Sequence, residues 1–197
     1  MTQLDEKPKP PEPQQGRVSK LIAPPEPRAH FIFWPIVIIG AVFDLWSKSA
    51  VFEWLKNEPD MEFSLIDGLL KFVMRENSGA AFSIARGQTT MLITVSVVAL
   101  VLVIGFFLFG NVRTKIMQVG LALFAAGIIG NLYDRVVNHG FVRDFIDIYR
   151  NDYHWPAFNV ADSMLCAAVG LLIIANIISE FAQRPARQQK AEPQDPH

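Results

Sequence analysis

Four long apolar stretches alternate with polar segments along the chain, at about residues 31–49, 90–110, 116–133 and 159–181. A helix rises roughly 1.5 Å per residue, so each stretch is long enough to cross about 30 Å of hydrocarbon. The pattern therefore predicts an all-α integral membrane protein with four transmembrane helices.

Two of the connections between these stretches, roughly 50–89 and 134–158, are much longer than the link between the second and third helices. Long connections are where functional residues tend to collect. In the first connection, residues 62–74 mix alternating and paired apolar positions around Gly68. This mixture is typical of one or two short strands at the membrane surface, and an amphipathic interfacial helix is the competing interpretation.

The two ends of the chain differ in composition from the rest. Residues 1–29 and 184–197 hold most of the thirteen prolines together with Gln, Glu, Lys and Arg. Such segments cannot bury enough apolar surface to pack, so we expect two disordered tails around one domain at 30–183. The first apolar run lacks a small-residue cleavage pattern, which indicates a retained helix.

Composition agrees with a membrane protein, because 51% of the residues are hydrophobic and 19% are charged. The formal net charge of -1 gives no large field that would favour a nucleic-acid partner. The single cysteine, Cys166, lies in an apolar run with no histidine near it in sequence. We interpret it as a buried thiol and not as a nucleophile.

The distribution of basic residues predicts the orientation. An even number of helices places both termini on one side of the membrane. Lys and Arg are dense in both tails and in the tight link at Arg113 and Lys115. Cytoplasmic termini follow from this density near helix ends, although the long first connection also carries basic residues, namely Lys56, Lys71, Arg75 and Arg86.

Polar side chains inside or next to the apolar stretches are costly to bury, so each is expected to have a polar partner or a functional role. Asp44 and Lys48 lie four residues apart on one face of the first helix, where they can pair. From spacing alone we interpret them as an interfacial ion pair, with Lys48 extending toward water. Asn77 is followed by small residues around Gly79, which favours either a plain turn or a close backbone approach.

The third helix closes with Asn131, Asp134 and Arg135. These residues are explained either by an interfacial cap, in which Asp134 and Arg135 exchange charge, or by a polar cluster that supports a site. The fourth helix opens with Asn159 as the expected N-cap and Asp162 at the third helical position. Backbone N–H groups and the helix dipole stabilise negative charge there, so capping and catalysis are compatible at Asp162.

Elimination leaves carboxylates as the candidates for chemistry. The sequence has no HExxH, no GxSxG and no phosphate-binding glycine loop, and its four histidines show no metal-ligand spacing. Two carboxylates held close together share one proton, so one can activate a water while the other polarises a carbonyl. Periodicity does not decide which two act, and four candidates lie near the outer membrane boundary: Asp134, Asp144, Asp147 and Asp162.

Five short motifs occur in a fixed order across the four predicted helices. They are Asp44-x-x-Ser-Lys48, Asn77-x-Gly-Ala-Ala-Phe-Ser83, Gly130-Asn-x-x-Asp-Arg135, Val142-Arg-Asp-Phe-Ile-Asp147 and Phe158-Asn-x-Ala-Asp162. Taken together, this set resembles that of the lipoprotein signal peptidase family, also called signal peptidase II.

The resemblance implies an aspartic endopeptidase of the bacterial inner membrane, working without a cofactor or metal. It would remove signal peptides from prolipoproteins by cutting before a cysteine that carries diacylglycerol. The catalytic pair that it implies is Asp144 and Asp162, near the periplasmic face. Its supporting positions match Asp44, Lys48, Asn77, Asn131, Arg135 and Asn159, with Asp134 a lesser candidate for structural support. It also implies a small β-like cradle in the first outer connection and, we expect, a monomer in contact with membrane lipids.

Two other classes compete with this interpretation. Intramembrane Asp and Asn residues also mark the ion paths of small transporters, but here they cluster at one boundary and no pair of broken helices is related as a repeat. A purely structural membrane subunit would leave the clustered aspartates without a reason.

Overall fold

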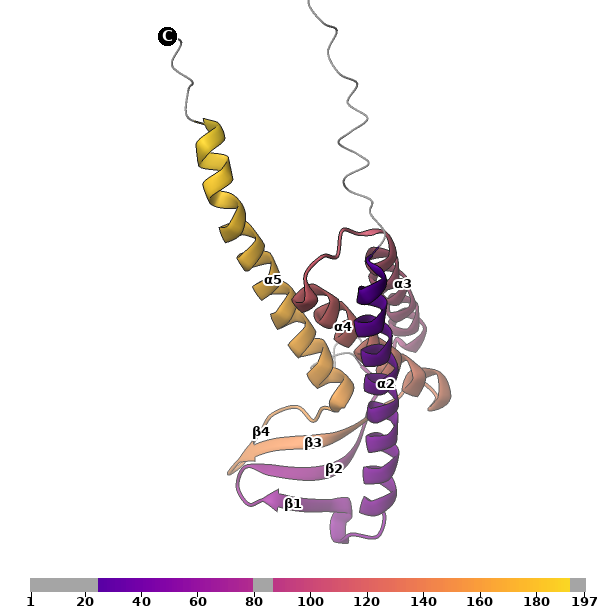
Figure 1. The fold of residues 1–197 in the computed structure, drawn as a ribbon. Coiled ribbons are helices and arrows are strands. Elements are labelled where there is room, and N and C mark those ends of the chain that lie inside the picture. Colours follow the sequence, from indigo (N-terminus) through magenta and orange to yellow (C-terminus); the bar gives the residue numbers. More distant parts are fainter. Residues whose placement is uncertain (1–24, 80–86, 192–197) are drawn as a thin grey trace, which may run out of the picture.

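The computed structural model describes residues 25–79 and 87–191, with side chains up to residue 181 (Figure 1). Within these ranges four long helices appear: α2 (Pro27–Leu55), α3 (Thr89–Phe109), α4 (Lys115–Val137) and α5 (Val160–Ala191). Each contains a window that is long and apolar enough to cross a membrane. The prediction of four transmembrane helices is confirmed.

Helix α4 is the centre of the bundle and packs against the other three helices. In its apolar window 56% of the residues are buried, compared with 11% in α3, so the outer helices present most of their surface to lipid. Small residues allow the close packing around α4. A side chain at Gly130 would overlap the carboxylate of Asp44, so the absence of a Cβ at this position lets α2 and α4 approach there.

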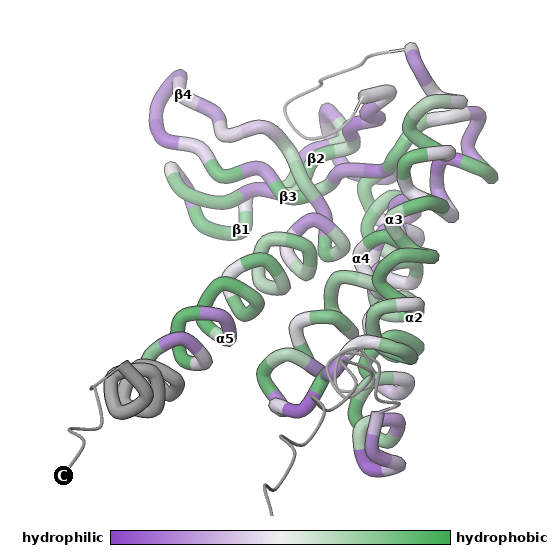
Figure 2. Tube along the Cα trace, turned by 90° about the horizontal axis from the view of Figure 1, so that it is seen from above, coloured by the Kyte–Doolittle hydropathy of each residue, from purple (hydrophilic) through white to green (hydrophobic). Residues whose placement is uncertain are grey.

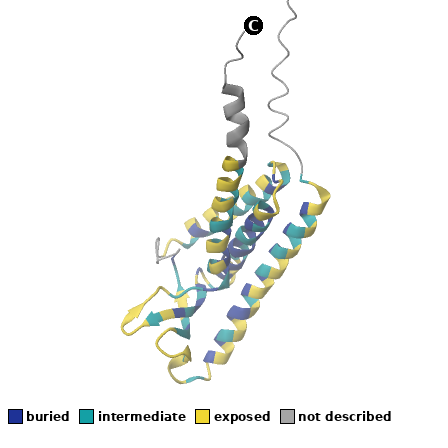
Figure 3. Ribbon diagram, turned by 60° about the vertical axis from the view of Figure 1, so that its left-hand side comes forward, coloured by how far each residue is buried: buried dark blue, intermediate teal, exposed yellow. Residues whose placement is uncertain are grey.

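Most of the exposed large apolar side chains lie on the helices that surround α4. Figure 2 shows hydrophobic residues along most of each helix and hydrophilic residues concentrated in the sheet and connections. Figure 3 shows the buried residues gathered toward the inside of the bundle. Exposed Ile and Val on α5 and α3 need no partner in the protein, because lipid is their solvent.

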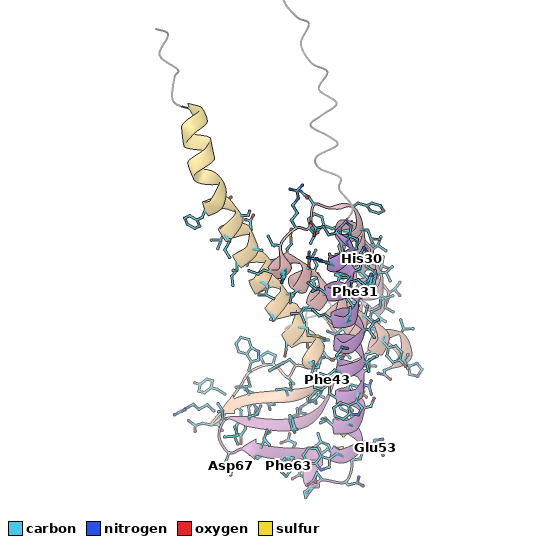
Figure 4. The ribbon with its side chains drawn as sticks, in the orientation of Figure 1. His30, Phe31, Phe43, Glu53, Phe63 and Asp67 are labelled. Carbon is cyan, nitrogen blue, oxygen red and sulfur yellow. The ribbon has the colours of Figure 1, made fainter. Side chains whose placement is uncertain are left out.

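Four short strands form one antiparallel sheet in the order β1-β2-β3-β4. The strands are β1 (Glu62–Ile66), β2 (Leu70–Asn77), β3 (Val142–Arg150) and β4 (Tyr153–His154), and a single 3₁₀ turn, η1 (Pro59–Met61), precedes β1. The sheet lies beside the C-terminal end of α2, where α5 begins (Figure 1). Figure 4 shows this arrangement, with His30 and Phe31 near one end of α2 and Glu53 near the other, at the level of the sheet that carries Phe63 and the turn with Asp67.

The strand interpretation of residues 62–74 is therefore confirmed, whereas β3 was not foreseen. Asp144 and Phe145 are neighbours in β3 and are both buried, so buried and exposed residues do not alternate along this strand. Pairing of β2 with β3 joins the two long connections into a single unit. The connections at 50–89 and 134–158 thus form one cradle instead of two separate loops.

The ends of two helices differ from the expected positions. Helix α2 continues to Leu55, and α5 continues to Ala191, which includes part of the tail that we expected to be disordered from residue 184. The residues after Phe181 are mostly Ala, Gln, Arg and Lys, all good helix formers, and these outweigh Pro185. Residues 1–24 and 192–197 of the two predicted tails lie outside the described part of the chain.

Candidate active site

A buried ion pair connects α2 to the site. Lys48 Nζ lies 2.8 Å from Asp44 Oδ2 and 3.4 Å from Asp134 Oδ2, and all three side chains are fully buried. The expectation that Lys48 extends toward water is wrong, because two carboxylates from α2 and α4 enclose the ammonium within the bundle. Asp44 also accepts a hydrogen bond from the backbone N–H of Ala161, which fixes α2 against the start of α5.

Asp134 pairs with Arg143 and not, as one of our interpretations had it, with Arg135. The Arg143 guanidinium donates to Asp134 over 2.7 Å, and the Arg143 backbone N–H donates to the same carboxylate over 3.0 Å. Asp134 is thereby fully engaged by two basic side chains and a backbone N–H. This interaction ties the first residues of β3 to the end of α4.

Helix α5 begins with the predicted capping arrangement. Asn159 Oδ1 accepts a hydrogen bond from the backbone N–H of Asp162, and Asp162 Oδ2 accepts one from the backbone N–H of Asn159. Two of the free N–H groups at the helix start are satisfied in this reciprocal way. The cap places the Asp162 carboxylate at the positive end of α5.

Asp144 lies in the buried part of β3 and is 2% exposed. Its two carboxylate oxygens accept hydrogen bonds from Asn159 Nδ2 at 2.7 Å and from Asn77 Nδ2 at 3.1 Å. Burial and the nearby charge of Asp162 together raise the pKa of Asp144 to about 7, against the lowering effect of the two amides. Asp144 therefore holds its proton close to neutral pH.

Asn131 connects Lys48 to Asp162. Its Oδ1 accepts a hydrogen bond from Lys48 Nζ at 2.9 Å, and its Nδ2 donates to Asp162 Oδ1 at 2.8 Å. An ammonium can only donate, so the oxygen of this amide faces Lys48 and its nitrogen faces Asp162. The buried cation thus determines which way Asn131 points and hence how Asp162 is held.

Arg135 holds the segment that follows β2. Its guanidinium donates to the carbonyl oxygens of Gly79 at 2.9 Å and Asn131 at 3.4 Å. Residues 80–83 of the motif that begins at Asn77 lie outside the described residues, so only Asn77, Ser78 and Gly79 of that motif can be placed.

The polar residues surround a cavity of about 960 Å³ between the sheet and the first turns of α5. Asp144 and Asp162 both line it, together with Asn77, Asn131 and Arg135. The other three residues lie behind the lining of the cavity. Lys48 and Asn159 donate hydrogen bonds to the lining residues Asn131 and Asp144, and Asp44 pairs with Lys48. All eight residues that the sequence singled out are therefore connected at one end of the helices.

Two side chains near the site, Arg143 and His154, were not singled out by sequence reasoning. Arg143 was missed as the partner of Asp134, although its position directly before Asp144 was a usable signal. The pair of Asp147 and His154 was also missed, because the short hairpin that brings them together was not predicted. Cys166, which we expected to be buried, is exposed and lines the cavity.

Comparisons with known proteins give the same picture. The family model described as signal peptidase (SPase) II matches residues 36–178. A lipoprotein signal peptidase from Sulfurihydrogenibium sp. is 40% identical, with 72% of this chain and 88% of that protein covered. One from Alteromonas mediterranea is 37% identical, with 71% of this chain and 76% of that protein covered.

A solved structure described as a bacterial membrane enzyme, determined by the in meso method, superimposes with a TM-score of 0.64 at 32% identity. It covers 74% of this chain and 87% of its own. The fold is thus that of a membrane-embedded enzyme. The chain belongs to the signal peptidase II family, and it is an aspartic protease of the bacterial inner membrane that removes signal peptides from prolipoproteins.

Proposed function

We propose that Asp144 and Asp162 are the catalytic pair of this protease. The observation that carries the proposal is their bridging by one residue, Asn159, at the wall of one cavity. The other two candidates have different partners, since Asp134 is engaged by Arg143 and Lys48, and Asp147 by His154.

The two carboxylates have different surroundings, and these suggest different roles. Asp144, with its pKa raised to about 7, carries the shared proton and polarises the scissile carbonyl. Asp162, at the start of α5, accepts hydrogen bonds from Asn131 and from a backbone N–H and acts as the base on the attacking water. The proton that Asp162 receives then passes to the leaving amine.

The supporting residues act on the pair through defined contacts. Asn77 and Asn159 orient Asp144, while Asn131 orients Asp162. Lys48 and Asp44 fix Asn131 and the start of α5 from inside the bundle. Arg135 holds Gly79 and so positions the chain that leaves β2 beside the cavity.

The substrate that we propose is a prolipoprotein whose cysteine carries diacylglycerol, cut just before that cysteine. The cavity supports this because polar groups of the pair share it with apolar side chains such as Leu165 and Phe158. Apolar walls next to a membrane suit acyl chains better than they suit a hydrated peptide alone.

The test of this substrate is cleavage of one purified prolipoprotein with and without the lipid, in the same detergent. Equal rates on both forms would contradict a requirement for the lipid.

We propose that both termini face the cytoplasm and that the cavity lies near the periplasmic face. The basic residues Arg113 and Lys115 lie at the end of the helices opposite the sheet, which supports this orientation. A reporter that is active only in the periplasm should give no signal when fused after residue 197. Signal from that fusion would reverse the topology.

We also propose that the enzyme works as a monomer in contact with membrane lipids. Every residue to which we assign a role comes from the same chain, so the site is complete without a second copy. Mass determination of the active protein in detergent, corrected for bound detergent, tests this proposal.

A further inference from the structure

A second polar pair lies in the same cavity, farther along β3 from the catalytic pair. Asp147 Oδ2 lies 2.8 Å from His154 Nδ1, and Lys71 Nζ lies 3.8 Å from the same oxygen. Both Asp147 and His154 line the cavity. The side chain of Asp147 is 7% exposed, so it is a buried carboxylate within the cradle.

An irregularity in β3 explains why Asp147 faces the cavity at all. In a regular strand, residues three positions apart point to opposite faces, which would send Asp144 and Asp147 to different sides. Here the backbone N–H groups of Phe145 and Ile146 both donate to the carbonyl oxygen of Phe158, at 3.0 and 2.8 Å. Two consecutive residues opposite one partner form a β-bulge, which re-aims the residues that follow it.

One carboxylate oxygen of Asp147, Oδ1, is among the buried polar atoms that lack a hydrogen-bond partner within the described part of the chain. Leaving a buried carboxylate oxygen unpaired is costly, and such groups are normally satisfied. Because Asp147 lines the cavity, an occupant of the cavity is the natural source of the missing donor.

We propose that Asp147 Oδ1 binds the prolipoprotein by accepting a hydrogen bond from one of its main-chain N–H groups. Lys71 Nζ already lies 3.8 Å from the Asp147 carboxylate, so the charge of Asp147 has a basic neighbour and a neutral N–H donor is sufficient for Oδ1. Every prolipoprotein has main-chain N–H groups whatever its sequence. The inference rests on the proposed function only in taking this cavity as the substrate site.

The spacing along β3 gives the position of the donor. Asp147 follows Asp144 by three residues, which in an extended chain is roughly 10 Å. An extended substrate whose scissile bond lies at Asp144 therefore presents the donor about three residues from that bond.

His154 is a positioning residue in this scheme, because it acts through Asp147. It fixes Oδ2 and so leaves Oδ1 as the oxygen that has no hydrogen-bond donor among the described residues. The His154 ring is itself held by stacking on Tyr149, with ring centroids 5.5 Å apart and planes 11° from parallel. Asn at position 154 would place an amide nitrogen close to the site of Nδ1, so His154→Asn should restore what His154→Ala loses.

The first experiment compares steady-state kinetics of Asp147→Ala, His154→Ala, His154→Asn and wild type. Loss of a hydrogen bond to a charged group should raise KM of Asp147→Ala about tenfold or more with little change in kcat. The matched control is Asp152→Ala, which removes an exposed carboxylate from the same hairpin. An unchanged KM in Asp147→Ala would overturn the proposal, and so would a fall in kcat alone.

The second experiment identifies the donor and does not depend on how well one variant folds. Substrates are N-methylated at one backbone position at a time, up to four residues on either side of the scissile bond. Methylation at one position should raise the KM of the wild type about tenfold, and the same methylation should not raise the KM of Asp147→Ala any further. The same sensitivity in both enzymes, or none at any position, would overturn the proposal. If Asp144→Asn still cleaved, the catalytic assignment would fail while this coupling could still be measured.

Discussion

The side-chain amide of Asn159 donates a hydrogen bond to Asp144 over 2.7 Å, and this is the shortest of the contacts that hold the Asp144 carboxylate. The same residue caps α5, because its Oδ1 accepts from the backbone N–H of Asp162 and its own backbone N–H donates to Asp162 Oδ2. One asparagine therefore sets both where α5 begins and how far Asp162 lies from Asp144. Its two roles can be separated by substitution.

We predict that Asn159→Ser retains the cap of α5 but lowers kcat, because it loses the hydrogen bond to Asp144. Serine is as good an N-cap as asparagine, yet its hydroxyl is too short to reach Asp144. Asn159→Ala should lose the cap as well, at about 0.5–2 kcal/mol. The thermal midpoint in detergent and the cleavage rate are measured for both variants. Equal activity of wild type and Asn159→Ser would show that the contact with Asp144 is not needed.

We predict that Asp144→Asn and Asp162→Asn each lower kcat by at least about 10²–10⁴, because neither variant retains both an acid and a base. The double variant should be no slower than the slower single variant, since the two groups act as a unit. A prolipoprotein cleavage assay with each purified variant measures this. Substantial turnover by a single variant would remove that residue from the pair and return Asp134 and Asp147 to consideration.

Much of the fold could be predicted because its signals are local in sequence. Hydropathy alone located all four helices, and the cap at Asn159 and Asp162 followed from spacing. The strand β3 could not be predicted, because both of its faces are covered near Asp144 and it lacks alternation. Its pairing with β2 is a contact between distant segments, which no local pattern reports.

In the site, too, contacts between neighbours in sequence could be predicted, whereas contacts between distant segments could not. Spacing on α2 predicted that Asp44 and Lys48 pair, but not that Lys48 would be enclosed, since burial depends on Asp134 from another helix. The neighbour of Asp134 in sequence, Arg135, was one expected partner, whereas the actual partner is Arg143 from the following strand. Choosing Asp144 and Asp162 among four aspartates required the family resemblance, because chemistry alone gave no ranking.

We predict that Lys48→Met destabilises the protein by about 3–5 kcal/mol, because it leaves the buried carboxylates of Asp44 and Asp134 without their shared cation. The matched control is Lys56→Met at the C-cap of the same helix, where the pair with Glu53 is exposed and contributes at most about 1 kcal/mol. Thermal unfolding in one detergent compares the two variants. Similar midpoints for both would mean that the buried cation is not needed for stability.

We predict that the stability of the wild type falls between about pH 4 and pH 7 through Asp144. Its folded-state pKa is raised to about 7, so the folded protein holds this proton more tightly than the unfolded chain. The contribution is full below the unfolded value and is lost as pH rises through the folded value. Asp144→Asn lacks this dependence, so its thermal unfolding midpoint should increase relative to that of the wild type as pH rises. A constant difference across this range would contradict the raised pKa.

The last prediction concerns the rate of cleavage against pH. The acid must hold its proton, and burial together with the charge of Asp162 raises the pKa of Asp144 to about 7, so activity should extend to neutrality and fall above it. At low pH the base becomes protonated and the rate falls again, which gives a bell whose limbs belong to the coupled pair and not to either residue alone. The proposed scheme uses no metal, so a strong chelator at fixed detergent and substrate should leave the bell unchanged. Loss of activity on chelation that added zinc restores would rule out the mechanism, and a rate that keeps rising well above pH 8 would remove Asp144 from the role of acid.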